Sequence, residues 1–260
     1  MTQLTDILRG QAYGHYELKL EREVKQGRIP KHVAVIMDGN RRYADETLHA
    51  DANQGHLKGK DKLEELLNWC LDLGVKVLTV YAFSSENLSR KEEEVDFLMD
   101  LLERSMLEFA DDERIHKNRV KMKMIGDMSM LPGKVAEAVR YAEERTSGYS
   151  DFHLNMAIAY GGRQEIKDAI KSIARKVKAG DLDIDEIDES LISEHMYSPG
   201  LPDPDLVLRT SGELRVSNFL LWQLAYSELY FSDVYWPGFR RMDFLRAIRS
   251  YQQRSRRFGQ

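Results

Sequence analysis

The sequence predicts an α/β fold in which a mostly parallel sheet is covered by helices on both faces. Between residues 31 and 210, short apolar segments and amphipathic segments alternate five times, which is typical of strands linked by crossover helices. No proline-rich or serine-rich linker and no internal repeat interrupts this alternation. We therefore expect one domain over residues 1–260, with an N-terminal helix over 1–27 and a C-terminal helix and tail over 241–260.

The expected strands are short apolar runs bounded by polar or glycine residues. Residues 33–37 form a continuous apolar run, which predicts a strand buried on both faces, and Asp38, Gly39 and Asn40 end it. The other expected strands are 77–83, 120–125, 152–159 and 205–209. In 120–125, lysines alternate with Val and Met, so we expect one face of that strand to be solvated.

The expected helices carry apolar residues at helical spacing. Gly27 and Pro30 end the first helix, and Gly74 caps a helix that runs through residues 63–70. Further helices are expected over 94–109, 131–145 and 163–178, near 185–195, and over about 241–255.

Composition limits the class of protein. The chain has 260 residues, 42% of them hydrophobic, and a net charge of −5, which argues against a nucleic-acid-binding protein. Its one cysteine, Cys70, permits neither an intrachain disulfide nor a thiolate zinc site. No signal peptide or membrane-spanning segment is evident, so we expect a cytoplasmic protein that can contact a membrane surface. The chain also lacks a P-loop and a Gly-x-Gly-x-x-Gly run, which excludes those nucleotide sites.

Polar residues follow four of the five expected strands. They lie in the segments 38–42, 84–90, 161–163 and 209–218. Parallel strands bring their carboxyl ends to one edge of the sheet, so these segments should converge there. Arginines together with hydroxyl and glycine residues favour an anion site such as a phosphate ester, with Asp38 available for magnesium. Any one segment is weak evidence, because an arginine near a strand end often pairs with a helix carboxylate, but the four segments together favour an anion site.

An apolar layer is expected beneath this polar edge. Met156, Ile158 and the helix over 94–109 supply it, and the chain contains eleven methionines. Methionine is flexible enough to line the path of a long apolar ligand, but plain core packing explains the same residues.

The chain resembles the cis-prenyltransferases, the family of undecaprenyl diphosphate synthase, from His32 to Gly259. The motifs that carry the resemblance are HVAVIMDGNRR, GHLKG, LTVYAFSSEN, YGGR and DLVLRTSGELRVSNFLLWQLAYSELYF. The resemblance implies a mostly parallel six-stranded sheet with an apolar tunnel that opens at its carboxyl edge. It also implies a Mg²⁺-dependent enzyme that condenses isopentenyl diphosphate with an allylic prenyl diphosphate, or another prenyl acceptor, to make a Z-configured polyprenyl diphosphate.

The resemblance also implies roles for particular residues. Asp38 and Asn87 would be catalytic, and Asp38 and Glu228 would bind the metal. Gly39, Asn40, Arg42 and His56 would hold the allylic diphosphate, and Arg209, Arg215 and Ser217 the isopentenyl diphosphate. Arg41, Ser84, Ser85, Glu86 and Arg90 would complete the substrate site. Arg257 and Gly259 of a C-terminal Arg-x-Gly tail would reach the neighbour's phosphate site across a homodimer.

The sequence departs from the family around the allylic substrate. Ala52 replaces a phosphate-binding arginine, and the loop over 44–54 is one residue longer than in the family. Leu88, Ala159 and Leu214 are further departures from common family residues. We therefore hypothesise an unusual prenyl donor or acceptor, or a short product.

Two alternatives stay open at this point. Phe152 and Ile158 are either plugs that limit product length or ordinary core residues. The chain could also be a non-catalytic subunit or a polyprenyl-lipid-binding protein, although the presence of both Asp38 and the Arg-x-Gly tail favours a self-sufficient homodimeric enzyme.

Overall fold

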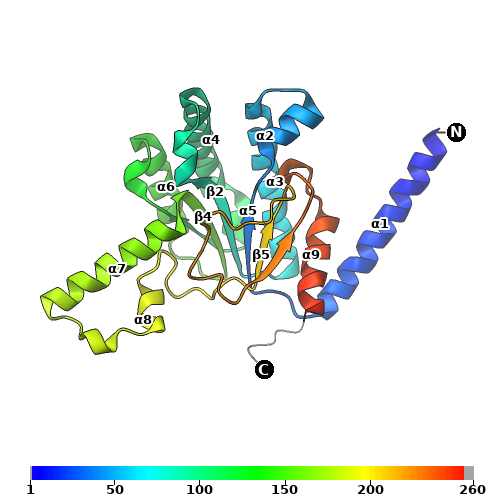
Figure 1. The fold of residues 1–260 in the computed structure, drawn as a ribbon. Helices are drawn as coiled ribbons and strands as arrows, with labels where there is room; N and C mark the ends of the chain where they lie inside the picture. Colours follow the sequence, from blue (N-terminus) through cyan, green and yellow to red (C-terminus); the bar gives the residue numbers. More distant parts are fainter. Residues whose placement is uncertain (1, 255–260) are drawn as a thin grey trace.

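Six parallel strands form one sheet in the order β3-β4-β2-β1-β5-β6 (Figure 1). The computed structural model describes the backbone of residues 2–254 and the side chains of residues 14–254. The strands are β1 His32–Ile36, β2 Val77–Ser84, β3 Val120–Ile125, β4 Phe152–Tyr160, β5 Leu206–Arg209 and β6 Glu228–Phe231. In the register of the central strands, Ile36 lies between Tyr81 and Arg209, so the segments that follow β1, β2 and β5 leave the sheet at one edge.

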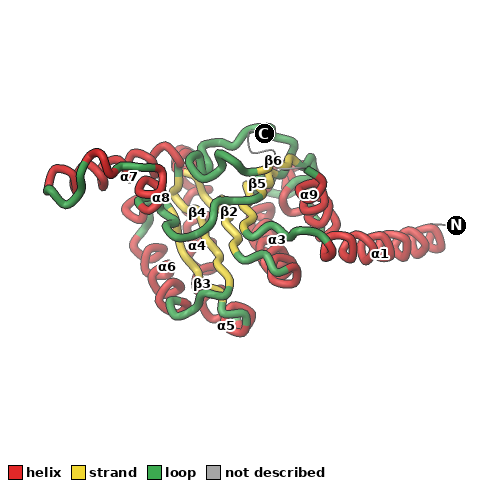
Figure 2. The backbone as a smooth tube through the Cα atoms, turned by 90° about the horizontal axis from the view of Figure 1, so that it is seen from below, coloured by secondary structure: helices red, strands yellow, loops and turns green. Residues whose placement is uncertain are grey.

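Helices and short helical turns connect the strands. The α-helices are α1 Thr2–Gln26, α2 Asn40–Tyr43, α3 Ala52–Leu73, α4 Glu92–Asp111, α5 Glu113–Lys117, α6 Gly133–Thr146, α7 Gly162–Ala179, α8 Glu189–Glu194 and α9 Arg241–Gln253. A π-helical turn, Ala44–Leu48, follows α2, and a 3₁₀ turn, Ser85–Ser89, follows β2. Seen from two directions, α1 and α7 extend from the body on opposite sides (Figures 1 and 2).

The two faces of the sheet bury cores of different size. The larger core lies under α3, α4, α6 and α9, against alternate strand residues such as Val33 and Val35. On the other face, Phe219 and Leu220 pack with Ala34 and Ile36. Both faces of β1 are therefore buried, which explains its continuous apolar sequence.

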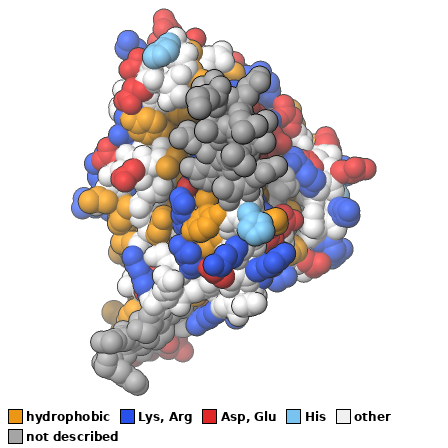
Figure 3. Space-filling model, turned by 90° about the vertical axis from the view of Figure 1, so that its right-hand side faces the viewer, with side chains coloured by type: hydrophobic (Ala, Val, Ile, Leu, Met, Phe, Trp, Pro, Cys, Tyr) orange, Lys and Arg blue, Asp and Glu red, His pale blue; other side chains and the backbone are white. Residues whose placement is uncertain are grey.

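The second half of α1 is attached to α9. Leu20 and Val24 are almost fully buried, and Arg241 forms ion pairs with Glu21 at 2.9 Å and Glu17 at 3.6 Å. Charged side chains of both signs are interspersed on this side of the molecule (Figure 3). The apolar contacts hold the helix in place, because surface ion pairs contribute only about 0 to 1 kcal/mol each.

The five strands expected from residue pattern are all present, with small differences at their ends. The sheet is entirely parallel rather than mostly parallel. The expected loop over 44–54 is wrong for most of its length, because residues 40–48 form helical turns and α3 already begins at Ala52. Asp51 caps α3 by accepting hydrogen bonds from the backbone N–H groups of Asn53 and Gln54.

Within residues 2–254, no helix combines the length and the apolar character needed to cross a membrane.

Candidate active site at the carboxyl edge of the sheet

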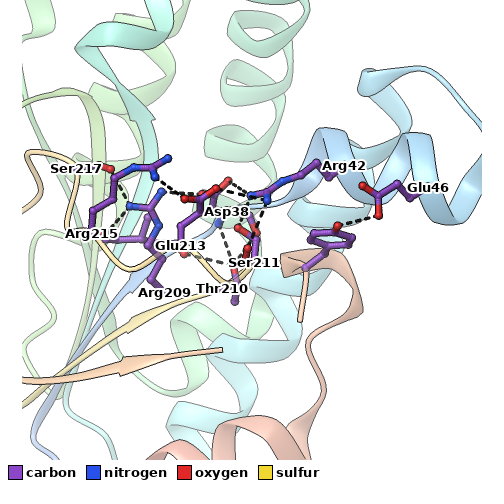
Figure 4. Close-up of polar contacts among 11 residues, drawn as sticks. Asp38, Arg42, Glu46, Arg209, Thr210, Ser211, Glu213, Arg215 and Ser217 are labelled. Carbon is purple, nitrogen blue, oxygen red and sulfur yellow. Dashed lines mark hydrogen bonds and ion pairs between the residues drawn. The ribbon is translucent and has the colours of Figure 1, made fainter. Parts of the chain in front are cut away.

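Asp38 lies directly beyond β1, where β5 runs beside it (Figure 4). One carboxylate oxygen accepts a hydrogen bond from Arg209 Nη2 at 2.7 Å, and the other lies 3.6 Å from Arg42 Nη2. The Thr210 hydroxyl accepts from the Asp38 backbone N–H and donates to its carbonyl, at 3.0 and 2.6 Å. These contacts hold both the backbone and the side chain of Asp38.

Charge controls the ionisation of Asp38. Burial by itself would raise the pKa of the carboxyl group, but the guanidinium groups of Arg209 and Arg42 outweigh burial and lower the pKa below its ordinary value. Asp38 is therefore ionised at neutral pH.

Arg209 is the most deeply buried cation of this site, with 4% of its surface exposed. Its Nη1 donates to Ser217 Oγ at 2.7 Å and to the Arg215 carbonyl at 2.5 Å. Its Nε is buried and has no hydrogen-bond partner among the described residues. A buried donor without a partner is costly, which favours an anionic ligand at this position.

Gly39 is required by the geometry of the chain next to Asp38. Its φ is +106°, and a Cβ atom would lie 2.8 Å from Tyr235 Cδ1 and 3.0 Å from Ser211 Cβ. Only glycine fits both the backbone angle and the space, so the Asp-Gly pair after β1 reflects close packing at the site.

The two glycines of the GHLKG motif let α3 approach Asn40. A Cβ atom on Gly55 would lie 2.0 Å from the Asn40 carbonyl oxygen, and one on Gly59 would lie 2.5 Å from Asn40 Oδ1. This close approach brings His56, on the same helix, to the cavity that Asn40 also lines.

Glu94, at the start of α4, gathers three basic side chains. Its Oε1 accepts from Arg90 Nη1 at 2.8 Å and lies 3.2 Å from His56 Nε2, while its Oε2 lies 3.7 Å from Arg41 Nη1. Burial lowers the pKa of His56 below its ordinary value despite the opposing effect of Glu94. The imidazole is thus neutral at neutral pH and donates from Nε2 to Glu94.

The turn after β2 is held by its own side chains. Asn87 Oδ1 accepts from the Ser84 backbone N–H at 3.0 Å, and Ser85 Oγ donates to Glu86 at 3.1 Å. Glu86 also accepts from Asn218 Nδ2 at 3.1 Å, which ties this turn to the loop after β5. The carbonyl oxygen of Asn87 is therefore occupied, and its NH₂ group is the part of the amide left for a ligand.

A polar cavity of about 540 Å³ brings most of the predicted residues together. The predicted residues that line it are Asp38, Asn40, His56, Ser84, Glu86, Asn87, Arg90, Arg209, Arg215 and Ser217. Gly39, Arg42, Arg41 and Ser85 are not lining residues, but each is joined to one of them through the chain or through a contact described above.

A small apolar pocket of about 70 Å³ adjoins the polar cavity. The apolar pocket continues along α4 to Ser105 and Phe109. Six residues line both: Met37, Asn40, His56, Ala82, Phe83 and Leu98. This pocket lies where the tunnel is expected, but its volume is far below that of a polyprenyl chain. The structure does not show a tunnel.

Phe152 and Ile158 do not line the apolar pocket. Ile158 is fully buried in the core, and Phe152 lies at the amino end of β4, with Lys76 Nζ 4.1 Å from its ring centre. This placement favours core packing for both. Met156, which we expected in the apolar layer beneath the polar edge, does line the pocket.

Glu228 is not brought to Asp38 within the chain. It begins β6 opposite Leu206, whereas the carboxyl end of β6, Phe231, lies opposite Arg209. At about 3.3 Å per residue, Glu228 is about 10 Å along the strand from the site edge. Its carboxylate accepts from Arg254 Nη1 at 2.8 Å. Glu228 therefore lies apart from Asp38 within one chain, and its association with the metal stays a prediction.

Arg257 and Gly259 lie outside the described residues. No group of three or more His, Cys, Asp or Glu side chains within the described part of the chain could hold a metal ion. Asp38 alone still fits Mg²⁺, because this ion is commonly held by one or two carboxylates together with substrate phosphates and water.

Three residues of the site were not assigned a role from the sequence. Tyr81 lines the cavity and donates from its hydroxyl to the Tyr160 carbonyl at 3.1 Å. Asn218 joins the turns after β2 and β4, and Glu213 lies between Arg42 and Arg215. Glu213 and Asn218 stand in the polar run after β5, which was the available signal, whereas Tyr81 lies inside an apolar strand.

The chain is similar to known proteins over most of its length. The model of the undecaprenyl diphosphate synthase family matches residues 36–259. A protein of Thermoplasma volcanium is 56% identical over 244 residues, which are 94% of each chain. A protein of Thermococcus kodakarensis is 51% identical over 259 residues, covering 100% of this chain and 98% of its own. Both are named tritrans,polycis-undecaprenyl-diphosphate synthase (geranylgeranyl-diphosphate specific).

Two solved structures share the fold. Lavandulyl diphosphate synthase from Lavandula x intermedia, in complex with dimethylallyl diphosphate, superposes with a TM-score of 0.83 at 37% identity, covering 89% of this chain and 99% of that chain. A probable undecaprenyl diphosphate synthase from Campylobacter jejuni gives a TM-score of 0.73 at 35% identity, covering 90% of this chain and 100% of that chain.

Proposed function

The chain belongs to the undecaprenyl diphosphate synthase family, and on this premise we propose that it extends geranylgeranyl diphosphate with isopentenyl diphosphate to a Z-configured polyprenyl diphosphate. It is a prenyl diphosphate synthase of the cis-prenyltransferase type, which condenses isopentenyl diphosphate with an allylic diphosphate. The observation that carries the proposal is the adjacency of a polar cavity rich in arginine and an apolar pocket, since both substrates have a diphosphate end and a hydrocarbon end.

Arg209, Arg215 and Ser217 are proposed to bind the diphosphate of isopentenyl diphosphate. They lie on β5 and the loop that follows it, and Arg209 Nε is the buried donor that has no partner within the described chain. Guanidinium groups bind phosphate oxygens through two parallel hydrogen bonds, so two arginines at one rim suit a diphosphate.

Asn40, Arg42 and His56 are proposed to bind the allylic diphosphate next to Asp38. When the allylic carbon–oxygen bond breaks, negative charge collects on the departing diphosphate, and the Asn40 amide and the Arg42 guanidinium group stabilise it. His56 can donate to the diphosphate once its Nε2–H turns away from Glu94. The adjoining apolar pocket keeps water from the carbocation that remains. Mg²⁺, when bound by Asp38 and the diphosphate oxygens, would supply further positive charge for this departure.

Asn87 and Arg90 are proposed to position the substrates. Asn87 offers its NH₂ group, since its carbonyl oxygen already accepts from Ser84. An amide has no basic nitrogen, so Asn87 cannot itself remove a proton at neutral pH.

Geranylgeranyl diphosphate is proposed as the donor for two reasons. Ala52 cannot bind a phosphate where the family uses arginine, which favours a donor other than the usual one. Relatives that cover nearly the whole chain at more than 50% identity carry geranylgeranyl-diphosphate specificity in their names.

A panel assay tests the donor. The chain is incubated with radiolabelled isopentenyl diphosphate, Mg²⁺ and dimethylallyl, geranyl, farnesyl or geranylgeranyl diphosphate, and the products are sized by chromatography. We expect the highest kcat/KM with geranylgeranyl diphosphate. A preference for farnesyl diphosphate would refute the proposed donor without affecting the reaction class.

We also propose a homodimer in which Arg257 and Gly259 complete the neighbour's site, and contact with a membrane surface during product release. Removal of the last four residues should then lower activity without changing the fold.

The alternative function is that of a non-catalytic lipid-binding protein. Such a protein would bind polyprenyl diphosphates without releasing diphosphate in the presence of Mg²⁺.

A further inference from the structure

Five charged side chains alternate in sign across the site (Figure 4). In order of contact they are Arg209, Asp38, Arg42, Glu213 and Arg215. Arg209 and Arg215 belong to the proposed isopentenyl diphosphate site, and Arg42 belongs to the proposed allylic site. The two carboxylates therefore stand between the cations of two different substrates.

Glu213 is the carboxylate that has no role in the proposed reaction. Its Oε1 lies 3.5 Å from Arg42 Nη1, and its Oε2 accepts a hydrogen bond from Arg215 Nη1. The side chain is 28% exposed, and it follows two residues, Ser211 and Gly212, whose φ is +75°. Each oxygen of one carboxylate thus contacts the arginine of one substrate site.

We propose that Glu213 couples the two diphosphate sites, so that either substrate diphosphate makes the other bind more tightly. This inference rests on the proposed function, because it takes Arg42 and Arg215 as ligands of the two diphosphates. Glu213 is a positioning residue here: it acts through the arginines and touches neither substrate.

The coupling follows from the shared carboxylate. A diphosphate carries more negative charge than one carboxylate, so it displaces Glu213 from the arginine that it binds. The two oxygens of Glu213 move together, so a rotation that frees Arg42 also disturbs the contact with Arg215. The first diphosphate overcomes both contacts, and the second meets an arginine that is already free, which is positive coupling.

Calorimetric binding measurements on the full chain test this. The ligands are isopentenyl diphosphate and the S-thiolo analogue of geranylgeranyl diphosphate, which does not ionise, each titrated alone and with the other saturating. The variants are wild type, Glu213→Gln and the control Glu46→Gln. Glu46→Gln removes the same charge on the helical turn that follows α2. The Glu46 carboxylate accepts from the Tyr235 hydroxyl at 2.8 Å and has no ion pair in the described chain.

In the wild type, each ligand should lower the Kd of the other by about fivefold or more. In Glu213→Gln, each ligand alone should bind more tightly than in the wild type, and the mutual effect should fall to within about twofold of none. Glu46→Gln should keep the wild-type coupling.

Several results would overturn the inference. One is a wild type that binds both ligands independently, and another is Glu213→Gln with unchanged coupling. Weaker binding of each single ligand in Glu213→Gln would show that Glu213 only supports the loop. If the wild type binds neither diphosphate, the proposed function itself is wrong, and the coupling between the two sites is refuted as well.

Discussion

Replacement of Arg209 by alanine tests the assignment of the isopentenyl diphosphate site most directly. In the unliganded chain, the guanidinium group donates to Asp38, Ser217 and the Arg215 carbonyl, and its Nε has no partner within the described residues. The variant removes every one of these donors from the cavity at once. Asp38 keeps its contact with Arg42 and partial access to solvent, so the variant should still fold.

The expected cost can be worked out from these contacts. A hydrogen bond to a charged group contributes about 1.5–3 kcal/mol, and a diphosphate would receive at least the free Nε donor and one Nη donor. Part of this is offset because the existing contacts to Ser217 and Arg215 are exchanged. We therefore expect a loss of about 2–4 kcal/mol, which is a rise of about 30- to 1,000-fold in the Kd for isopentenyl diphosphate.

Calorimetry of isopentenyl diphosphate binding measures this change, and urea unfolding of the same sample checks the fold. Arg175→Ala is the matched control, since this arginine is exposed on α7 and has no ion pair in the described part of the chain. The control should leave the Kd unchanged. An unchanged Kd or KM in Arg209→Ala, with the fold intact, would refute the assignment.

Three further predictions concern the metal residue, pH and product length. Asp38→Ala should remove nearly all turnover while the chain stays folded, as initial rates and circular dichroism would show. Normal turnover would refute the role of Asp38 as a metal-binding catalytic residue. Burial lowers the pKa of His32 from 6.5 to about 4. Between these two pH values, His32 is protonated in the unfolded chain and neutral in the folded chain. Stability should thus fall as pH drops below about 6.5, by about 2–3 kcal/mol at about pH 4.5, and urea unfolding of His32→Gln should show a smaller loss. Ser105→Phe should shorten the product by filling the apolar pocket, whereas Ser105→Ala should not; identical chromatograms for both variants would contradict this role.

Residue pattern predicted five of the six strands because each of the five is a short segment rich in apolar residues. β1 is buried on both faces, and the polar run that begins at Asp38 marks its end. The helical turns over residues 40–48 were missed because Asp38, Gly39 and Asn40 are also typical of a loop. β6 is short and only half-buried, and it is not distinguished by residue pattern from the segments around it.

The convergence of the polar segments was predictable from the expected parallel strands. The contacts between their side chains were not. Parallel strands place Asp38, Ser84 and Arg209 at one edge whatever their side chains do. The contact of Glu94 with His56, Arg90 and Arg41 depends on how α3 and α4 pack, and no local pattern reports this. The position of Glu228 at the amino end of β6 was likewise not predictable, since a matching motif does not say at which end of a strand a residue lies.

By itself, the sequence determined the α/β class, the edge of the sheet at which the polar segments converge and the concentration of arginines there that favours an anion site. These follow from local apolar pattern and from residue type, which act over a few neighbouring residues. Tertiary structure alone decided which carboxylate faces which arginine, that Glu213 contacts both Arg42 and Arg215, and that Glu228 lies apart from Asp38 within one chain. The physical reason is that ion pairs and pockets depend on distances between segments far apart in the chain, and the packing of helices on the sheet sets those distances.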